Sequence, residues 1–304
     1  MLIIFCFKIR CLVKLRYFSA VALPDSLLYN KYAGLHFCIN GGGFMKIAAV
    51  QAAISYGDVD ANYHIADQAV EAAAAADADI IVLSELWNTS FYPPDVYDLA
   101  DEEGKRTKAF LSDAAKRHHV HIVGGSVANK KQGKLYNSTF IVDRTGQVVG
   151  EYDKVHLFTP GKEDTVFTPG DHLNIFELDG VKMASIICYD VRFGEWVRMA
   201  ALAGAQILFV PAAWPNPRLG HWQILNQARA IENQMFVVAV NSCGQAGEYQ
   251  FCGGSMIIDP WGKVLSQADG REQIITSDVD LSVIKGIRSS INVFRDRRPE
   301  LYHL

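Results

Sequence analysis

Three residues whose side chains could act together in nucleophilic chemistry each follow an apolar stretch of the chain. Glu85 ends the run IIVLSE, Lys154 follows VVGEYD, and Cys188 follows MASII in the segment VKMASIICYDVRFGEW. A thiol is activated by an adjacent general base, and a nearby cation stabilises a thiolate or an oxyanion. Carboxylate, amine and thiol are therefore the components of a cysteine hydrolase, if the fold brings them together.

Each of the three residues also has an ordinary structural explanation. Free cysteine is among the residue types most often buried, and lysine is nearly always exposed. A glutamate at the end of an apolar run can simply begin a turn. The catalytic interpretation therefore depends on the elements that position Glu85, Lys154 and Cys188.

Those elements recur as an internal repeat. MKIAAVQ at 45 resembles VKMASII at 181, ADIIVLSELWN at 78 resembles AQILFVPAAWP at 205, VHIVGGSV at 120 resembles MFVVAVNS at 235, and STFIVDRTGQVVG at 138 resembles SMIIDPWGKVLS at 255. The order is the same in both halves, which indicates a duplicated structure. Each half predicts a strand, a helix, a strand, a helix and a pair of strands.

The repeat predicts the fold class. Amphipathic runs over 62–79, 106–119, 194–205 and 221–234 predict helices. IIVL and ILFV are continuously apolar, so both faces of these strands must be covered. We therefore predict an α/β protein, a four-layer αββα sandwich of two pseudo-symmetric halves. A single doubly wound sheet is the alternative, disfavoured because no Gly-rich phosphate loop follows the first strand. Sites in α/β proteins gather at the carboxyl ends of strands, where all three residues lie.

Composition restricts the partners. The 304 residues are 50% hydrophobic and carry a net charge of -4, which suits a sizeable core and gives no basic surface for nucleic acid. No apolar stretch approaches the ~20 residues of a membrane span. Cys188, Cys243 and Cys252 are too widely spaced for a disulfide framework, which favours the cytoplasm. The clustered histidines lack metal-ligand spacing, so neither a metal nor a cofactor is predicted.

Residues 1–44 differ in character from the rest of the chain. Short apolar runs alternate with Lys and Arg, and three glycines precede Phe44 and Met45. We expect an extension that is disordered or translated from upstream of the natural start, with a targeting peptide as a further alternative. The predicted domain is 45–304.

The motif blocks carry a family resemblance. SELW with Glu85, YDKVHLF with Lys154 and CYDVRFGE with Cys188 resemble the nitrilase, or carbon-nitrogen hydrolase, superfamily in order and spacing, over residues 45–304. The resemblance implies an αββα sandwich in which Glu85 takes the proton of Cys188 and the sulfur attacks an amide carbon. It also implies an oxyanion held by Lys154 and the Tyr189 backbone N–H, and a thioester that water hydrolyses.

The resemblance further implies a second glutamate after the lysine block. Glu163 in HLFTPGKEDTVFTPG is the best match, although a solvated loop glutamate beside Lys162 and Asp164 is the alternative. Family members usually pair through helices, so a homodimer or higher homo-oligomer is expected through GEWVRMAALAG (194–204) and FRDRRPELYHL (294–304).

Loops around the three residues must select the substrate. NTSFYPPD supplies Tyr92, and AAWPNPRLGHW supplies Trp214 and Arg218. Trp214 aligns with Trp87, so a core role for both is the alternative. Guanidinium groups pair well with carboxylates, and we predict that Arg218 or Arg192 meets a substrate carboxylate. Of the two, Arg192 is the weaker candidate because it could be structural.

The substrate implied is a small amide. Within the family the sequence is most similar to the ω-amidase branch, which acts on ω-amides of 2-oxo dicarboxylic acids such as 2-oxoglutaramate. Hydrolysis of N-carbamoyl amines or nitriles would use the same residues. A non-catalytic, partner-binding member of the fold is the alternative of another class.

Overall fold

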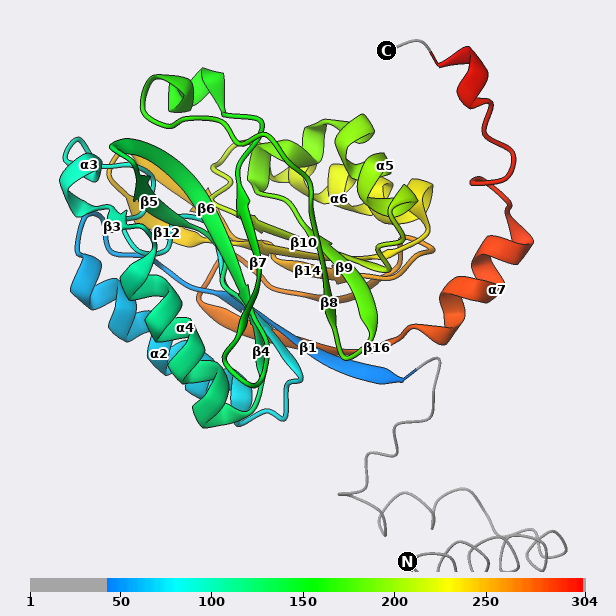
Figure 1. Cartoon of the computed structure of the whole chain (residues 1–304), viewed down its shortest axis with the longest axis horizontal. Coiled ribbons are helices and arrows are strands. Elements are labelled where there is room, and N and C mark those ends of the chain that lie inside the picture. The colour runs from blue at the N-terminus through cyan, green and yellow to red at the C-terminus, as the bar shows by residue number, and fades with distance from the viewer. Residues whose placement is uncertain (1–42, 303–304) are drawn as a thin grey trace, which may run out of the picture. The chain divides into compact units, whose positions relative to one another are not determined.

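Two β-sheets packed face to face, with helices on their outer sides, form the part of the chain described by the computed structural model, residues 43–302 (Figure 1). The first sheet contains β1 (Phe44–Gln51), β2 (Ile80–Val82), β3 (Asp101–Glu102), β4 (His121–Val123), β5 (Val127–Lys131), β6 (Lys134–Val142), β7 (Val148–Asp153) and β16 (Gln273–Asp280). The second contains β8 (Asn174–Leu178), β9 (Val181–Ser185), β10 (Ile207–Ala212), β11 (Phe236–Asn241), β14 (Met256–Ile258) and β15 (Val264–Gln267). The hairpin β12 (Cys243–Ala246) and β13 (Tyr249–Cys252) stands apart from both.

Helices cover the outer face of each sheet (Figure 1). The first sheet is covered by α2 (Val59–Ala74) and α4 (Lys105–His118), and the second by α5 (Gly194–Leu202) and α6 (Leu219–Asn233). The remaining helical elements are α3 (Val96–Leu99), α7 (Ser282–Ser290), η2 (Thr159–Gly161), η3 (Glu163–Thr165), η4 (Cys188–Arg192) and η5 (Pro299–Leu301). The four predicted helices are thus present, each close to its expected bounds.

Successive side chains along each strand point to opposite faces of the sheet, and this alternation builds the layers. Ile80 and Val82 of β2 pack between the two sheets, whereas Ile81 packs against the helices. On β10, Phe209 lies between the sheets and Leu208 faces the α5 and α6 side. A continuously apolar strand is required because each of its faces meets a different apolar layer. The predicted αββα sandwich is confirmed.

The two halves share their topology. β1, β2 and β4 are parallel neighbours followed by the antiparallel pair β6 and β7, and β9, β10, β11, β14 and β15 repeat this arrangement. Asp143 closes the first hairpin by accepting the N–H groups of Thr145 and Gln147, both at 2.9 Å. Asp259 closes the second in the same way. Such side-chain acceptors stabilise tight turns.

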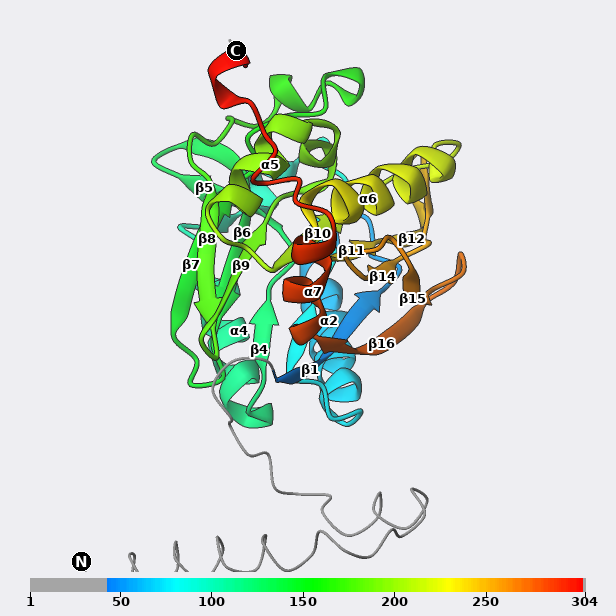
Figure 2. The same cartoon turned by 90° about the vertical axis from the view of Figure 1, so that its right-hand side faces the viewer.

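One strand crosses between the halves, which the repeat did not predict. β16, near the end of the chain, pairs with β1 along its whole length, from Phe44 opposite Asp280 to Gln51 opposite Gln273 (Figure 2). The predicted extension over 1–44 lies outside the described residues except for Gly43 and Phe44. Of these, Phe44 already belongs to β1, one residue before the expected domain start. Among the described helices, none combines the length and apolar character needed to cross a bilayer.

Candidate active site

Each of the three candidate catalytic residues lies just after a strand, as the sequence predicted. Glu85 lies just beyond β2, Lys154 directly follows β7, and Cys188 opens η4 after β9. The first two strands belong to one sheet and β9 to the other. All three side chains are buried. The site therefore lies where the two sheets meet, with each half contributing part of it.

Lys154 is a buried cation held between two carboxylates. Its Nζ lies 2.8 Å from Oε1 of Glu85 and 2.8 Å from Oε2 of Glu163, and its side chain is 0% exposed. Burial of a charge is tolerated when the charge is paired. Although burial lowers it, the carboxylates of Glu163 and Glu85 hold the pKa of Lys154 well above its usual value.

Glu163 lies inside the site rather than in solvent. It opens η3, is fully buried, and accepts the Phe158 N–H at 2.6 Å through Oε2 in addition to the Lys154 ammonium. Burial raises the pKa of Glu163, and the charge of Lys154 opposes that shift. The alternative of a solvated loop carboxylate does not fit this position.

Glu85 is held from both halves of the molecule. Its Oε2 accepts the N–H of Ala213, which follows β10 of the second sheet, at 2.6 Å. Its Oε1 accepts the side-chain amide of Asn137 on β6 at 2.9 Å. The sequence motifs pointed to neither partner. The available signal for Asn137 was an amide side chain within the predicted strand segment LYNSTFIV.

Cys188 stands at a strained turn. Its φ of +46° lies in the left-handed region, which non-glycine residues rarely adopt and which clusters at functional sites. Burial and the neighbouring Glu85 carboxylate raise the pKa of the Cys188 thiol well above its usual value, while Lys154 acts in the opposite direction. A carboxylate therefore lies near enough to influence the proton of this thiol.

One carboxylate, that of Asp190, connects this turn to the end of β7 and the residues after it, which include Lys154. Asp190 accepts the Ile187 N–H at 2.8 Å and the Tyr152 hydroxyl at 2.7 Å through Oδ2. Its Oδ1 accepts the His156 backbone N–H at 2.9 Å and contacts His156 Nδ1 at 2.8 Å. Tyr152 and His156 flank Lys154 by two residues on either side. The turn that carries Cys188 and the lysine are thus fixed relative to each other.

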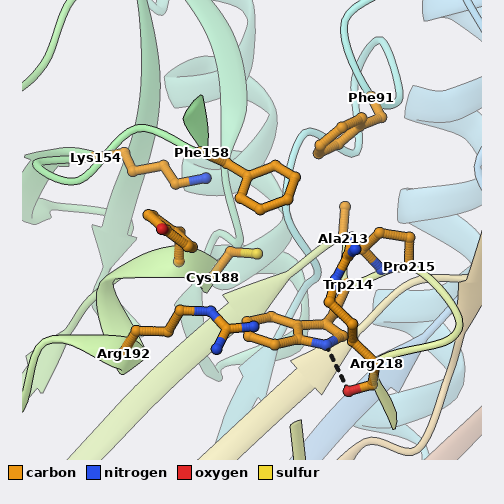
Figure 3. Close-up of a pocket in the computed structure, with 10 residues that line it drawn as sticks. Phe91, Lys154, Phe158, Cys188, Arg192, Ala213, Trp214, Pro215 and Arg218 are labelled. Atoms are coloured by element: carbon orange, nitrogen blue, oxygen red, sulfur yellow. Dashed lines mark hydrogen bonds between the residues drawn. The ribbon is translucent and has the colours of Figure 1, made fainter. Parts of the chain in front are cut away.

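A small pocket opens above Cys188 (Figure 3). It is lined by Phe91, Lys154, Phe158, Cys188, Tyr189, Arg192, Ala213, Trp214, Pro215 and Arg218. The Lys154 amine and the Cys188 thiol both reach this space (Figure 3). Apolar walls with a few polar groups are typical of small-molecule sites.

Two guanidinium groups line the pocket. Arg192 lies over the Trp214 ring, with 4.6 Å between its Cζ and the ring centroid, and Arg218 lies 5.4 Å from the centroid of Phe158. Within residues 43–302, neither arginine forms an ion pair with a carboxylate. Two cations without a protein counter-ion make this pocket suited to an anionic ligand.

Trp214 and Tyr92, which were also predicted to bind substrate, differ in their position relative to the pocket. Trp214 walls the pocket and donates from Nε1 to the Arg218 carbonyl at 2.9 Å (Figure 3). Trp214 is also part of the buried core of the second half, and its counterpart in the repeat, Trp87, packs in the core beneath α2 and α4. Tyr92 is not among the lining residues. Its hydroxyl donates to the Gly161 carbonyl, in the loop that leads to Glu163.

The acidic side chains of the site contact the Lys154 ammonium. In the described part of the chain, no group of three or more His, Cys, Asp or Glu side chains is arranged to bind a metal ion. Glu85 and Glu163 direct their oxygens at Lys154 Nζ.

The αββα sandwich with its buried glutamate, lysine and cysteine defines the class of protein, a hydrolase of the nitrilase superfamily. The family model for carbon-nitrogen hydrolases matches residues 46–289, and the chain belongs to this family. It is 44% identical to the 2-oxoglutaramate amidase of Bacillus subtilis over 256 residues, which cover 84% of this chain and 98% of that protein.

Further comparisons agree. The chain is 33% identical to the omega-amidase NIT2 of Homo sapiens over 267 residues, which cover 84% of this chain and 96% of the human protein. A solved CN-hydrolase superfamily protein from Xanthomonas campestris superposes with a TM-score of 0.80 at 26% identity, covering 86% of this chain and 99% of that one. The predicted family is confirmed, and the chain is a hydrolase that acts on carbon-nitrogen bonds other than peptide bonds.

Proposed function

We propose that the protein is an amidase that hydrolyses a small, carboxylate-bearing ω-amide, such as 2-oxoglutaramate, to the acid and ammonia. The observation that carries this proposal is the buried cluster of Glu85, Lys154 and Cys188 beneath a pocket whose two arginines form no ion pair with the described carboxylates. The similarity to a 2-oxoglutaramate amidase and to omega-amidases supports the same substrate class.

Catalysis begins with the neutral thiol. Glu85 takes the proton of Cys188 as Sγ attacks the amide carbon, so that the thiolate need not exist beforehand. The tetrahedral oxyanion is stabilised by the Lys154 ammonium and by the Tyr189 backbone N–H. Tyr189 lies in the first turn of η4, where N–H groups have no partner within the helix. Glu163 keeps Lys154 oriented toward this oxyanion.

The second stage releases both products. Glu85 returns its proton to the leaving nitrogen, the carbon-nitrogen bond breaks, and ammonia departs from a thioester on Cys188. The same carboxylate then takes a proton from water as the water oxygen attacks the thioester carbon. When the carbon-sulfur bond breaks, the acid is released and Cys188 regains its proton.

Ammonia release from a panel of substrates tests this function. The panel contains 2-oxoglutaramate, other ω-amides, N-carbamoyl amines and nitriles, with Cys188→Ala as the control. The ω-amides should give the highest kcat/KM, and Cys188→Ala should abolish release. A preference for carbamoyl amines or nitriles would show that the substrate is not an ω-amide but belongs to that other class. If no compound released ammonia, or if release survived in Cys188→Ala, the protein would instead be a non-catalytic member of the fold.

We also propose that two copies pair through α5 and the C-terminal segment around η5. Large apolar side chains are exposed on both, namely Met199, Leu202, Leu301 and Tyr302. Clustered exposed apolar surface is typical of protein interfaces.

A cytoplasmic location is supported by Cys188, Cys243 and Cys252, which are free thiols.

A further inference from the structure

A buried asparagine on β6 bridges the two carboxylates of the site. The Asn137 side chain donates from Nδ2 to Oε1 of Glu85 at 2.9 Å and to Oε1 of Glu163 at 3.1 Å. Asn137 is 0% exposed, so bulk water does not compete for these contacts. The amide thus uses its donor group on both acids at once.

The backbone of the same residue holds the cation. The Asn137 carbonyl accepts the N–H of Lys154 at 2.9 Å, and the Lys154 ammonium in turn lies 2.8 Å from Oε1 of Glu85. One residue therefore fixes both the start of the lysine side chain and the carboxylates that the ammonium contacts. The Asn137 Oδ1 atom has no hydrogen-bond partner among the described residues, so the donor side alone orients this amide.

The chemistry of a neutral donor explains why an amide suits this position. Two carboxylates around one ammonium repel each other, and a hydrogen bond to the charged form favours ionisation. An amide supplies this stabilisation without a second positive charge, which would compete with Lys154 for the acids. Loss of the donor removes this stabilisation from both carboxylates.

We propose that Asn137 is a positioning residue that keeps Glu85 and Glu163 ionised and in place around Lys154. The inference rests on the proposed roles of Cys188 as nucleophile and Glu85 as its base. Asn137 does not line the pocket, so it acts through the two glutamates rather than on the substrate.

Asn137→Asp tests the role because it keeps the shape and replaces the donor by a third carboxylate. The readout is the rate at which iodoacetamide alkylates Cys188 as a function of pH, followed by peptide mass spectrometry. Alkylation requires transfer of the thiol proton to an ionised carboxylate. The acid side of the profile should move upward by about one pH unit or more in the variant. In the ammonia assay at neutral pH, kcat should fall about tenfold while KM stays nearly constant.

Asn226→Asp on α6 is the matched control. Asn226 is also 0% exposed, donates from Nδ2 to the Trp222 carbonyl at 2.8 Å, and has an Oδ1 without a described partner. The substitution therefore buries an added carboxylate at a similar cost, but away from the two glutamates. Its alkylation profile should match that of the wild-type protein.

Asn137→Ala keeps the test decisive if the Asp variant does not fold, as judged by circular dichroism. Asn137→Ala removes the donor without adding charge. The acid side of the alkylation profile should therefore move to higher pH, as for Asn137→Asp, but by a smaller amount. A wild-type profile in a folded Asn137 variant would overturn the proposed role. Alkylation needs no substrate, so this result is independent of whether any compound in the panel is hydrolysed.

Discussion

The charge around Cys188 differs from that around a cysteine held as a thiolate. Two carboxylates, Glu85 and Glu163, face the ammonium of Lys154, and burial together with Glu85 raises the pKa of the thiol even though Arg192 and Arg218 line the same pocket. Reactive cysteines with a lowered pKa sit in electropositive surroundings. In the proposed mechanism the thiol proton moves to Glu85 during attack, so reactivity should decline as acid protonates the carboxylates.

The two pocket arginines lead to a prediction on substrate affinity. Arg218→Ala should raise KM for a dicarboxylic monoamide about 10- to 100-fold, with kcat nearly unchanged, because a charge-assisted contact of about 1.5–3 kcal/mol is lost. A neutral amide of similar length is the control, and its KM should not change. Steady-state kinetics on both substrates measure the difference.

Arg192→Ala completes that experiment. Arg192 packs on the Trp214 ring, so its loss should also disturb the pocket wall and lower kcat. An unchanged KM for the monoamide in Arg218→Ala would remove Arg218 from substrate recognition. A rise in KM confined to Arg192→Ala would assign the contact to Arg192 instead.

Among the elements, the loop after β4 determines where Glu85 lies. Gly125 has a φ of +62°, and a Cβ there would fall 2.1 Å from the Ser84 carbonyl oxygen. The next residue, Ser126, donates its N–H to that same oxygen at 3.0 Å and accepts the Leu86 N–H at 3.0 Å through Oγ. The glycine permits a close backbone approach that holds the residues on both sides of Glu85.

Gly125→Ala should therefore affect stability and catalysis together. We expect the free energy of unfolding to fall by about 2–4 kcal/mol and kcat to fall by about 100-fold, because Glu85 is displaced. Gly133→Ala is the matched control, since its φ is +78° but a Cβ there meets nothing within 4 Å. It should cost about 1 kcal/mol from backbone strain alone and leave kcat unchanged.

Urea unfolding and ammonia release measure both effects. If Gly125→Ala behaved like Gly133→Ala in both assays, the close approach would not be what positions Glu85.

The helices, strands and loops also differ in how far the sequence could predict them. Strand-end residues such as Glu85 and Cys188 were predictable because apolar runs and the repeat reveal where strands end. The hydrogen-bond partners of Glu85, such as Asn137 and the Ala213 N–H, were not predictable, because these contacts join strands that are far apart in the sequence. The hairpin β12–β13 and the pairing of β16 with β1 interrupt the repeat, so periodicity gave no signal for them.

For the molecule as a whole, the site exists only when the two sheets pack together. Glu85 and Lys154 come from the first sheet and Cys188 from the second, and the Ala213 N–H joins the second sheet to Glu85. The apolar layer that includes Phe209 holds the sheets in this register. Activity should therefore depend on the packing of the whole sandwich rather than on either half.

Pairing of two copies is the prediction at this scale. Leu202→Glu on α5 places a charge in the proposed interface and should convert a dimer into a monomer of 33.7 kDa. Trp261→Glu is the control, because Trp261 is a large exposed side chain on the turn between β14 and β15. Sedimentation velocity measures the mass. A monomeric wild-type protein, or a dimer that survives Leu202→Glu, would contradict pairing through α5.

The pairing of β16 with β1 has a consequence for synthesis on the ribosome. β1 is the first described strand to be translated and β16 the last, yet they are neighbours over eight residues each. Until β16 emerges, one edge of β1 has unpaired backbone groups, and such edges invite association with other chains. A nascent chain that stalls before β16 therefore carries an exposed edge, which is covered only when the last of the described strands has been made.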